Sequence, residues 1–137
     1  MILPQTEWLP PKEFPDLSKH KEIAIDLETK DPDLKKKGSG SVVGRGEIVG
    51  FAVAVEGWKG YYPIAHETGP NMNREKVIEW FTNVCALPAT KIFHNAMYDV
   101  CWIRKLGIKI NGLVADTMIA ASLINENRYS YTLNTLS

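Results

Sequence analysis

The chain has 137 residues, of which 45% are hydrophobic and 23% are charged, and its 16 basic residues balance its 16 acidic residues. This length and composition are typical of one soluble globular domain with a real core. A net charge of zero disfavours a domain that only binds nucleic acid. Cys85 and Cys101 lack zinc-site spacing and no apolar run could span a bilayer, so we expect free thiols, no membrane association and a cytoplasmic protein.

The chain begins with a proline-rich segment and then a strand. Residues 1–20 carry four prolines and are predicted to form an extended N-terminal arm. Alternating apolar residues in Lys21–Glu28 predict a strand, with Asp26 and Glu28 on one face at its C-terminal end. The charged, glycine-rich segment Thr29–Gly46 is predicted to be a loop, whose basic side chains either meet phosphates or are simply solvated.

Two further strands are predicted to complete a meander. Glu47–Val55 is almost continuously apolar, as in a strand that is covered on both faces, and Glu56 and Gly57 mark a turn. Trp58–Ile64 is predicted to return as a third strand, and Pro63 indicates that this strand lies at the edge of the sheet.

The second half of the chain alternates helices with short strands, and Asn73 is a suitable N-cap for the first helix. The predicted elements are helix Arg74–Leu87, strand Lys91–Phe93, helix Ala96–Leu106, strand Leu113–Ala115, helix Thr117–Ile124 and the start of another helix within Asn125–Ser137. This order predicts an α/β fold, in which helices pack on the faces of a mixed sheet.

Polar side chains follow the predicted first and fourth strands. Asn95 and Asp99 lie one helical turn apart after the fourth strand, which places them on one side of the helix start. If that strand is parallel to the first, Asp99 faces Asp26 and Glu28 across the end of the sheet. Carboxylates this close repel each other unless a cation lies between them, and hard divalent ions prefer oxygen ligands. The pattern therefore favours a two-metal site for phosphodiester hydrolysis.

Each of these residues also has a plainer interpretation. The first strand could simply end in a polar turn after Asp26 and Glu28. Asp99 could be a solvent-facing aspartate on a helix, and Asn95 could be a helix cap and nothing more. A helix cap at Asn95 is compatible with a functional site, because it would fix the helix that carries Asp99.

Two motifs carry a family resemblance. They are IAIDLETKDPDL and HNAMYD, and the later segment ADTMIAASLI supports them. Asp26 and Glu28 match an Asp-x-Glu motif that is followed by Thr29, and Asn95 and Asp99 match an Asn-x-x-x-Asp motif. In this order they resemble the 3′–5′ exonuclease domain of family A, phage-type DNA polymerases. That family belongs to the DEDD exonucleases, which have a ribonuclease H-like fold.

The resemblance implies a set of roles. The residues expected to be catalytic and to bind two Mg²⁺ or Mn²⁺ ions are Asp26, Glu28 and Asp99. The residues expected to bind substrate are Thr29, Asn95 and Tyr98, the last by stacking on a base. The implied substrate is the 3′ end of single-stranded DNA. The implied partner is a polymerase domain in the same longer chain, in the cytoplasm of a bacterium or of a phage-infected host.

The third motif of the family, Tyr-x-x-x-Asp or His-x-x-x-Asp, is absent. Tyr129 and Tyr131 have no aspartate four residues later. Asp116 matches the Asp-Thr segment that precedes the third motif, so it is expected to support the metal ligands rather than to bind the ion itself. Residues 21–137 are therefore expected to be a partial exonuclease domain with a ribonuclease H-like fold that is incomplete at its C-terminus.

Two other functions stay open on the sequence alone. One is ribonuclease D-like trimming of RNA 3′ ends, although the DPDL…GxG loop favours DNA. The other is a non-catalytic domain that binds a single-strand end or a partner protein. Retention of Asp26, Glu28 and Asp99 argues against such degeneration, whereas the missing third motif argues for it.

Overall fold

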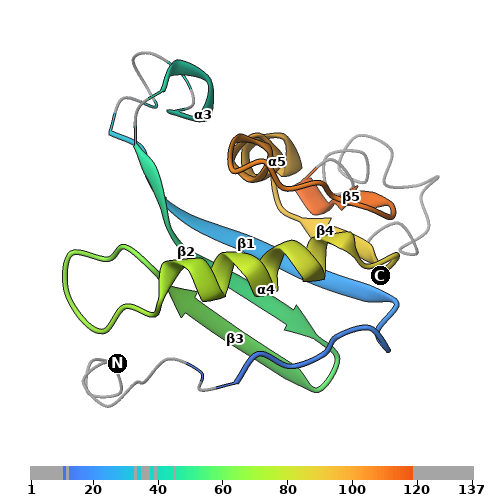
Figure 1. Ribbon diagram of the computed structural model, residues 1–137. Coiled ribbons are helices and arrows are strands. Elements are labelled where there is room, and N and C mark those ends of the chain that lie inside the picture. The colour runs from blue at the N-terminus through green and yellow to red at the C-terminus, as the bar shows by residue number, and fades with distance from the viewer. Residues whose placement is uncertain are drawn as a thin grey trace.

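The computed structural model describes residues 11, 13–32, 34, 38, 40–44 and 46–118. The strands are β1 (Glu22–Lys30), β2 (Glu47–Val55), β3 (Trp58–Pro63), β4 (Thr90–Phe93) and β5 (Val114–Asp116). The helices are α3 (Gly40–Val43), α4 (Arg74–Ala86) and α5 (Ala96–Lys105). The five strands form one sheet in the order β3-β2-β1-β4-β5 (Figure 1).

Strand β1 lies at the centre of a mixed sheet. It pairs antiparallel with β2 and parallel with β4, while β2 pairs antiparallel with β3 and β4 pairs parallel with β5. The predicted meander and the edge position of the third strand are confirmed, and the fourth strand has the parallel orientation that a meeting of Asp99 with Asp26 and Glu28 requires. The α/β class with a mixed sheet is confirmed as well.

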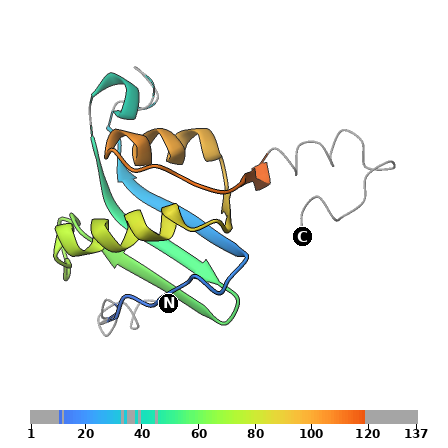
Figure 2. The same ribbon diagram turned by 45° about the vertical axis from the view of Figure 1, so that its right-hand side comes forward.

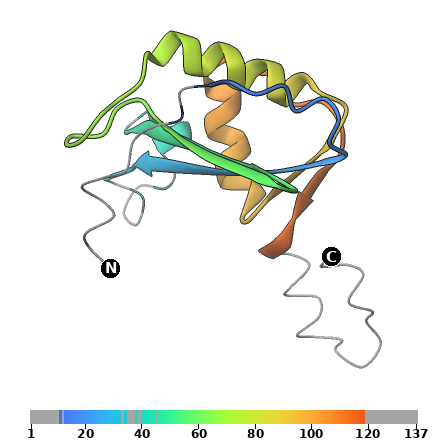
Figure 3. The same ribbon diagram turned by 90° about the horizontal axis from the view of Figure 1, so that it is seen from below.

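The period-two pattern of β1 separates the two faces of the sheet. Its apolar positions Ile23, Ile25 and Leu27 are buried, whereas the alternate positions, including Asp26 and Glu28, are exposed. Helices α4 and α5 lie on the same side of the sheet (Figures 2 and 3). In the described part of the chain no helix covers the opposite face, to which the two carboxylates belong.

Helix α4 buries one apolar stripe against the sheet. The N-cap Asn73 accepts a hydrogen bond from the Lys76 amide at 3.0 Å, as its position before the helix predicts. The buried side chains of α4 are Val77, Trp80, Phe81, Val84 and Cys85. They meet the buried face of β1 and β2 in one core, in which the rings of Phe51 and Phe81 lie 4.5 Å apart.

The segment before β1 packs on the same side of the sheet as α4. The Trp80 indole donates to the carbonyl of Pro15 at 2.9 Å, and the Tyr62 hydroxyl donates to the carbonyl of Glu13 at 2.9 Å. These bonds satisfy the polar atoms of two buried aromatic rings. They also fasten residues 13–15 to the domain.

Several element boundaries differ from the predicted ones. Strand β1 continues to Lys30, because Thr29 and Lys30 still pair with β2, so the loop that follows is shorter than expected. The predicted helix Thr117–Ile124 lies outside the described residues except for its first two, and the segment Asn125–Ser137 lies wholly outside them. No helix among the described residues is long and apolar enough to cross a membrane.

Candidate active site

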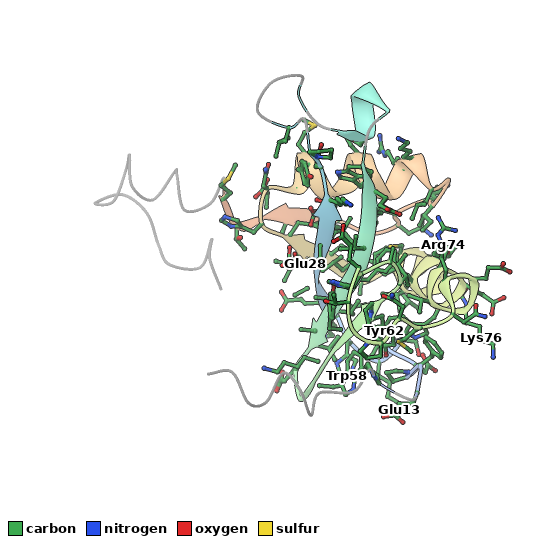
Figure 4. The ribbon with its side chains drawn as sticks, turned by 90° about the vertical axis from the view of Figure 1, so that its left-hand side faces the viewer. Glu13, Glu28, Trp58, Tyr62, Arg74 and Lys76 are labelled. Carbon is green, nitrogen blue, oxygen red and sulfur yellow. The ribbon has the colours of Figure 1, made fainter. Side chains whose placement is uncertain are left out.

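Two carboxylates of β1 stand on the open face of the sheet. Opposite them on β2 are small residues, since Asp26 pairs with Ala52 and Glu28 pairs with Gly50. Figure 4 shows Glu28 on the side of the sheet that faces away from α4. The register of the β1–β2 pair shifts directly after Glu28, and such bulges commonly re-aim side chains next to active sites.

Asp99 approaches β1 from the first turns of α5. It belongs to the buried stripe of that helix and only 4% of its surface is exposed. Its Oδ2 atom accepts a hydrogen bond from the Leu27 amide at 3.3 Å. Strand β4 pairs with β1 only as far as Ala24, so the Leu27 amide lies beyond that pairing and meets Asp99 instead. The alternative of a solvent-facing Asp99 is wrong.

The ionised form of Asp99 is disfavoured at this position. Burial raises the pKa of its carboxyl group to about 7, and the negative charges of Asp26, Glu28 and Asp116 act in the same direction. The hydrogen bond from Leu27 lowers the pKa but does not offset burial. A carboxyl group that titrates near neutral pH beside other carboxylates is a frequent mark of a functional site.

The three predicted ligands are neighbours but do not form a closed metal cage. Within the described part of the chain, no three His, Cys, Asp or Glu side chains are grouped so that they could hold an ion. Asp26 and Glu28 are exposed, whereas Asp99 is buried against the backbone of β1. Among the described residues no cation forms an ion pair with any of the three, whereas Lys30 of the same strand pairs with Glu67. All three side chains offer carboxylate oxygen atoms, which are the type of ligand that a hard divalent ion prefers.

Asp116 holds the start of α5. Its Oδ2 atom accepts from the Ala96 amide at 2.8 Å, and its Oδ1 atom accepts from the amides of Asn95 at 3.0 Å and Met118 at 2.9 Å. The interpretation of Asn95 as a side-chain cap is wrong, because its backbone is left-handed (φ 65°) and its side chain makes no cap bond. A carboxylate from β5 therefore caps the helix that carries Asp99.

Replacement of Asp116 by alanine is expected to lower the free energy of unfolding by about 2 kcal/mol, because two amides of the α5 terminus lose a charged acceptor. Amide hydrogen exchange at Asn95 and Ala96 should become faster. Asn73→Ala is the matched control, since it removes the cap of α4: it should destabilise by about 1 kcal/mol and leave those two amides unchanged. Unchanged exchange at Asn95 and Ala96 in Asp116→Ala would contradict the capping role.

Two of the predicted substrate-binding residues contact each other. The hydroxyl groups of Thr29 and Tyr98 lie 2.7 Å apart, and the Tyr98 hydroxyl donates to Asp31 at 2.9 Å. Asp31 in turn accepts from the Gly40 amide, at 2.9 and 3.1 Å to its two oxygen atoms. This chain of bonds ties the end of β1 to α5 and to the start of α3. No pattern in the sequence indicated this role of Asp31.

Tyr61 also borders the carboxylates and His66 contacts Tyr61, and no pattern in the sequence indicated a role for either residue. Tyr61 lines a groove of about 670 Å³ together with Asp26, and its hydroxyl is hydrogen-bonded to His66. The two-residue turn after Val55 fixes the register of the β2–β3 hairpin, so the pairing of Tyr61 with Ala52 could have been predicted from the sequence. The position of Tyr61 near Asp26 could not, because it also depends on how β2 pairs with β1.

Comparison with known proteins decides the family. Residues 5–137 match the model of the 3′–5′ exonuclease family. This chain belongs to the 3′–5′ exonuclease family. It is 33% identical over 141 residues to a DNA-directed DNA polymerase of Pseudomonas phage M6, which covers 96% of this chain and 21% of the polymerase. It is 29% identical over 126 residues to DNA polymerase DpoZ of Salmonella phage PMBT28, which covers 90% of this chain and 18% of that protein.

The exonuclease chain also resembles solved nuclease structures. NrnC of Brucella melitensis superposes with a TM-score of 0.57 at 19% identity, over 81% of this chain and 48% of NrnC. At this identity the likeness shows the fold, and it agrees with the predicted ribonuclease H-like class. The exonuclease chain spans about a fifth of the length of the two phage polymerases that it matches.

Proposed function

We propose that this chain is the 3′–5′ exonuclease domain of a DNA polymerase and that it removes the terminal nucleotide from the 3′ end of single-stranded DNA. The observation that carries the proposal is the position of Asp99, which reaches the backbone of β1 between the two carboxylates Asp26 and Glu28. The family match and the polymerase relatives support it. In this proposal a polymerase domain belongs to the same longer chain.

Asp26, Glu28 and Asp99 would hold two Mg²⁺ or Mn²⁺ ions. The donor set supports this, because hard divalent ions prefer carboxylate oxygen and because a cation would favour the ionised form of Asp99, whose pKa is raised by burial and by the neighbouring carboxylates. A solved structure of NrnC from Brucella melitensis contains bound Mg²⁺. When bound, such ions lower the pKa of a coordinated water and stabilise negative charge on the leaving oxygen.

The protein groups around the carboxylates would set their positions. Asp116 fixes the start of α5 and thereby Asp99, while the Leu27 amide orients the Asp99 carboxylate toward β1. Thr29, Tyr98 and Asn95 would contact the terminal nucleotide. The exposed Asn95 is free of a capping role, and the half-buried Tyr98 is held at its hydroxyl by Thr29.

Titration with Mn²⁺ by calorimetry tests the metal site. The wild-type chain should bind Mn²⁺, and Asp26→Ala should bind it at least tenfold more weakly, because the loss of a ligand exceeds the loss of a supporting contact. Asp26 is exposed, so the variant should remain folded. Asp16→Ala, which removes an exposed aspartate before β1, is the control and should bind as wild type does. Equal affinity of Asp26→Ala and wild type would refute the proposed site.

The substrate is tested by binding in Ca²⁺, with oligonucleotides of one sequence at one salt concentration. Single-stranded DNA with a free 3′ end should bind more tightly than blunt duplex DNA or than the same strand with its 3′ end blocked. A single-stranded RNA of the same sequence distinguishes the ribonuclease D-like alternative. Tighter binding of the RNA would replace DNA by RNA as the proposed substrate, and tighter binding of the duplex would count against a 3′-end nuclease.

A further inference from the structure

Tyr61 of β3 shares the open face of the sheet with the two carboxylates of β1. Ala52 of β2 pairs with Asp26 on one side and with Tyr61 on the other, so these three residues form one row across the sheet. The small side chain of Ala52 leaves the space between Asp26 and Tyr61 open. Both residues line the groove of about 670 Å³ on this face.

The Tyr61 ring leans along the sheet toward Glu28. A Cβ atom at Gly50 would lie only 2.0 Å from the Tyr61 hydroxyl oxygen, so the phenol occupies the space of a side chain at that position. Gly50 is the direct cross-strand partner of Glu28. Side chains in such pairs lie about 4.5–5.5 Å apart at their Cβ atoms. The Tyr61 hydroxyl therefore stands where the cross-strand neighbour of Glu28 would stand.

His66 fixes this hydroxyl from the other side. The Tyr61 oxygen and His66 Nε2 are 2.5 Å apart, and their rings meet edge to face. The Asn71 side chain accepts from the His66 amide and donates to the His66 carbonyl, both at 2.9 Å, which holds the backbone of His66. Both residues lie in the loop that follows β3.

That loop is itself anchored beside Glu28. The amides of Ile64 and Ala65 both donate to the carbonyl of Val49, at 2.8 and 3.1 Å. Val49 is the residue of β2 at which the register with β1 shifts, directly after Glu28. The bulge that ends the regular pairing at Glu28 thus also positions the loop that carries His66.

The charges of the site favour one arrangement of the protons. A tyrosine phenol is neutral near pH 7, so the Tyr61 hydroxyl keeps its proton on a face that it shares with the carboxylates Asp26 and Glu28. Negative charge attracts that proton. The favoured arrangement has His66 Nε2–H donating to the Tyr61 oxygen and the hydroxyl proton turned toward Glu28.

We propose that Tyr61 is a positioning residue that orients the Glu28 carboxylate for a divalent cation. His66 holds the Tyr61 hydroxyl, and the absence of a side chain at Gly50 leaves room for it. The inference rests on the proposed function, in which Glu28 is a metal ligand. Hydrogen-bond donors behind a ligand fix its orientation, and their loss typically lowers metal affinity about 10–100-fold. The assignment explains why β2 has glycine at residue 50 and why the loop after β3 is bonded to the bulge.

Mn²⁺ calorimetry on four variants, each also examined by thermal denaturation, tests the inference. Tyr61→Phe keeps the ring and should bind Mn²⁺ about tenfold more weakly than wild type. Tyr62→Phe is the matched control, because its hydroxyl contacts the Glu13 carbonyl on the helix side of the sheet (Figure 4). It should lose a similar amount of stability without any change in Mn²⁺ affinity. His66→Ala should weaken binding as Tyr61→Phe does, and His66→Gln, which retains an N–H donor, should restore part of it.

The outcomes separate this inference from the proposed function. If wild type binds Mn²⁺ and Tyr61→Phe binds it equally well, the positioning role is wrong while the metal site stands. If Tyr62→Phe loses as much affinity as Tyr61→Phe, the effect reflects general destabilisation and the positioning role is again wrong. If wild type binds no Mn²⁺, the proposed function and this inference fall together.

Discussion

Asp99→Asn should make the metal-free protein more stable at pH 8 by about 2–4 kcal/mol and change its stability at pH 4 by less than about 1 kcal/mol. The pKa of Asp99 is raised from its ordinary value of 3.8 to about 7, chiefly by burial. Asparagine has nearly the same shape, can still accept from the Leu27 amide, and carries no charge that must be buried.

The direction of this effect follows from the protons that each state binds. Well below pH 4, Asp99 is protonated in the folded and the unfolded chain, so it does not affect stability. Between pH 4 and 7 the unfolded chain releases the proton while the folded chain keeps it, so the free energy of unfolding of wild type falls as pH rises. Above pH about 7 both states are ionised, and the free energy of unfolding of wild type falls no further on this account. Asp99→Asn cannot ionise, so its free energy of unfolding does not show this fall.

Urea denaturation from pH 4 to pH 8 in the presence of a chelator measures the effect. Asp16→Asn is the control, because hydrogen bonds from Ser18 lower the pKa of Asp16 and the sign of its pH dependence is opposite. A difference between wild type and Asp99→Asn that does not change with pH would contradict the raised pKa. Added Mn²⁺ should stabilise wild type more than Asp99→Asn if Asp99 is a metal ligand, because a ligand of the folded state shifts the equilibrium toward it.

Lys91→Met should lower the free energy of unfolding by about 3 kcal/mol, although this residue takes no part in the proposed chemistry. Lys91 is fully buried, and its ammonium group donates to the carbonyls of Leu87, Ala89 and Asn111. Burial lowers the pKa of Lys91, and the three carbonyl oxygens offset part of the cost of burying the charge. Methionine keeps the apolar stem but leaves three inward-facing carbonyls without their donor.

Lys91 joins three segments next to β4. It connects the end of α4, the turn before β4 and the segment before β5, and its own amide donates to Leu113 at 2.8 Å. Lys109→Met, at an exposed position, is the control and should change stability by less than about 0.5 kcal/mol. Guanidinium denaturation of the two variants gives the comparison. Equal stabilities would mean that water replaces the lysine at these carbonyls.

The sequence alone determined the local structure and the family of this protein. The period-two pattern of β1 placed Asp26 and Glu28 on one face, because side chains alternate along any strand whatever its neighbours are. Glu47–Val55 was predicted with the bounds it has, and Asn73 caps α4 as its place before the helix indicates. These features depend on residues that are close in sequence, as do the two motifs by which the family was identified.

Only the tertiary structure decided which distant residues meet, because those contacts depend on strand order and register. Asp116 rather than Asn95 caps α5, since β5 lies beside β4 and brings its carboxylate to the helix start. Tyr61 lies over Gly50, the cross-strand partner of Glu28, only through the pairing of three strands and the absence of a side chain at Gly50. No pattern within a single segment encodes such contacts. The raised pKa of the Asp99 carboxyl group likewise arises from burial and from charges that the fold brings near it.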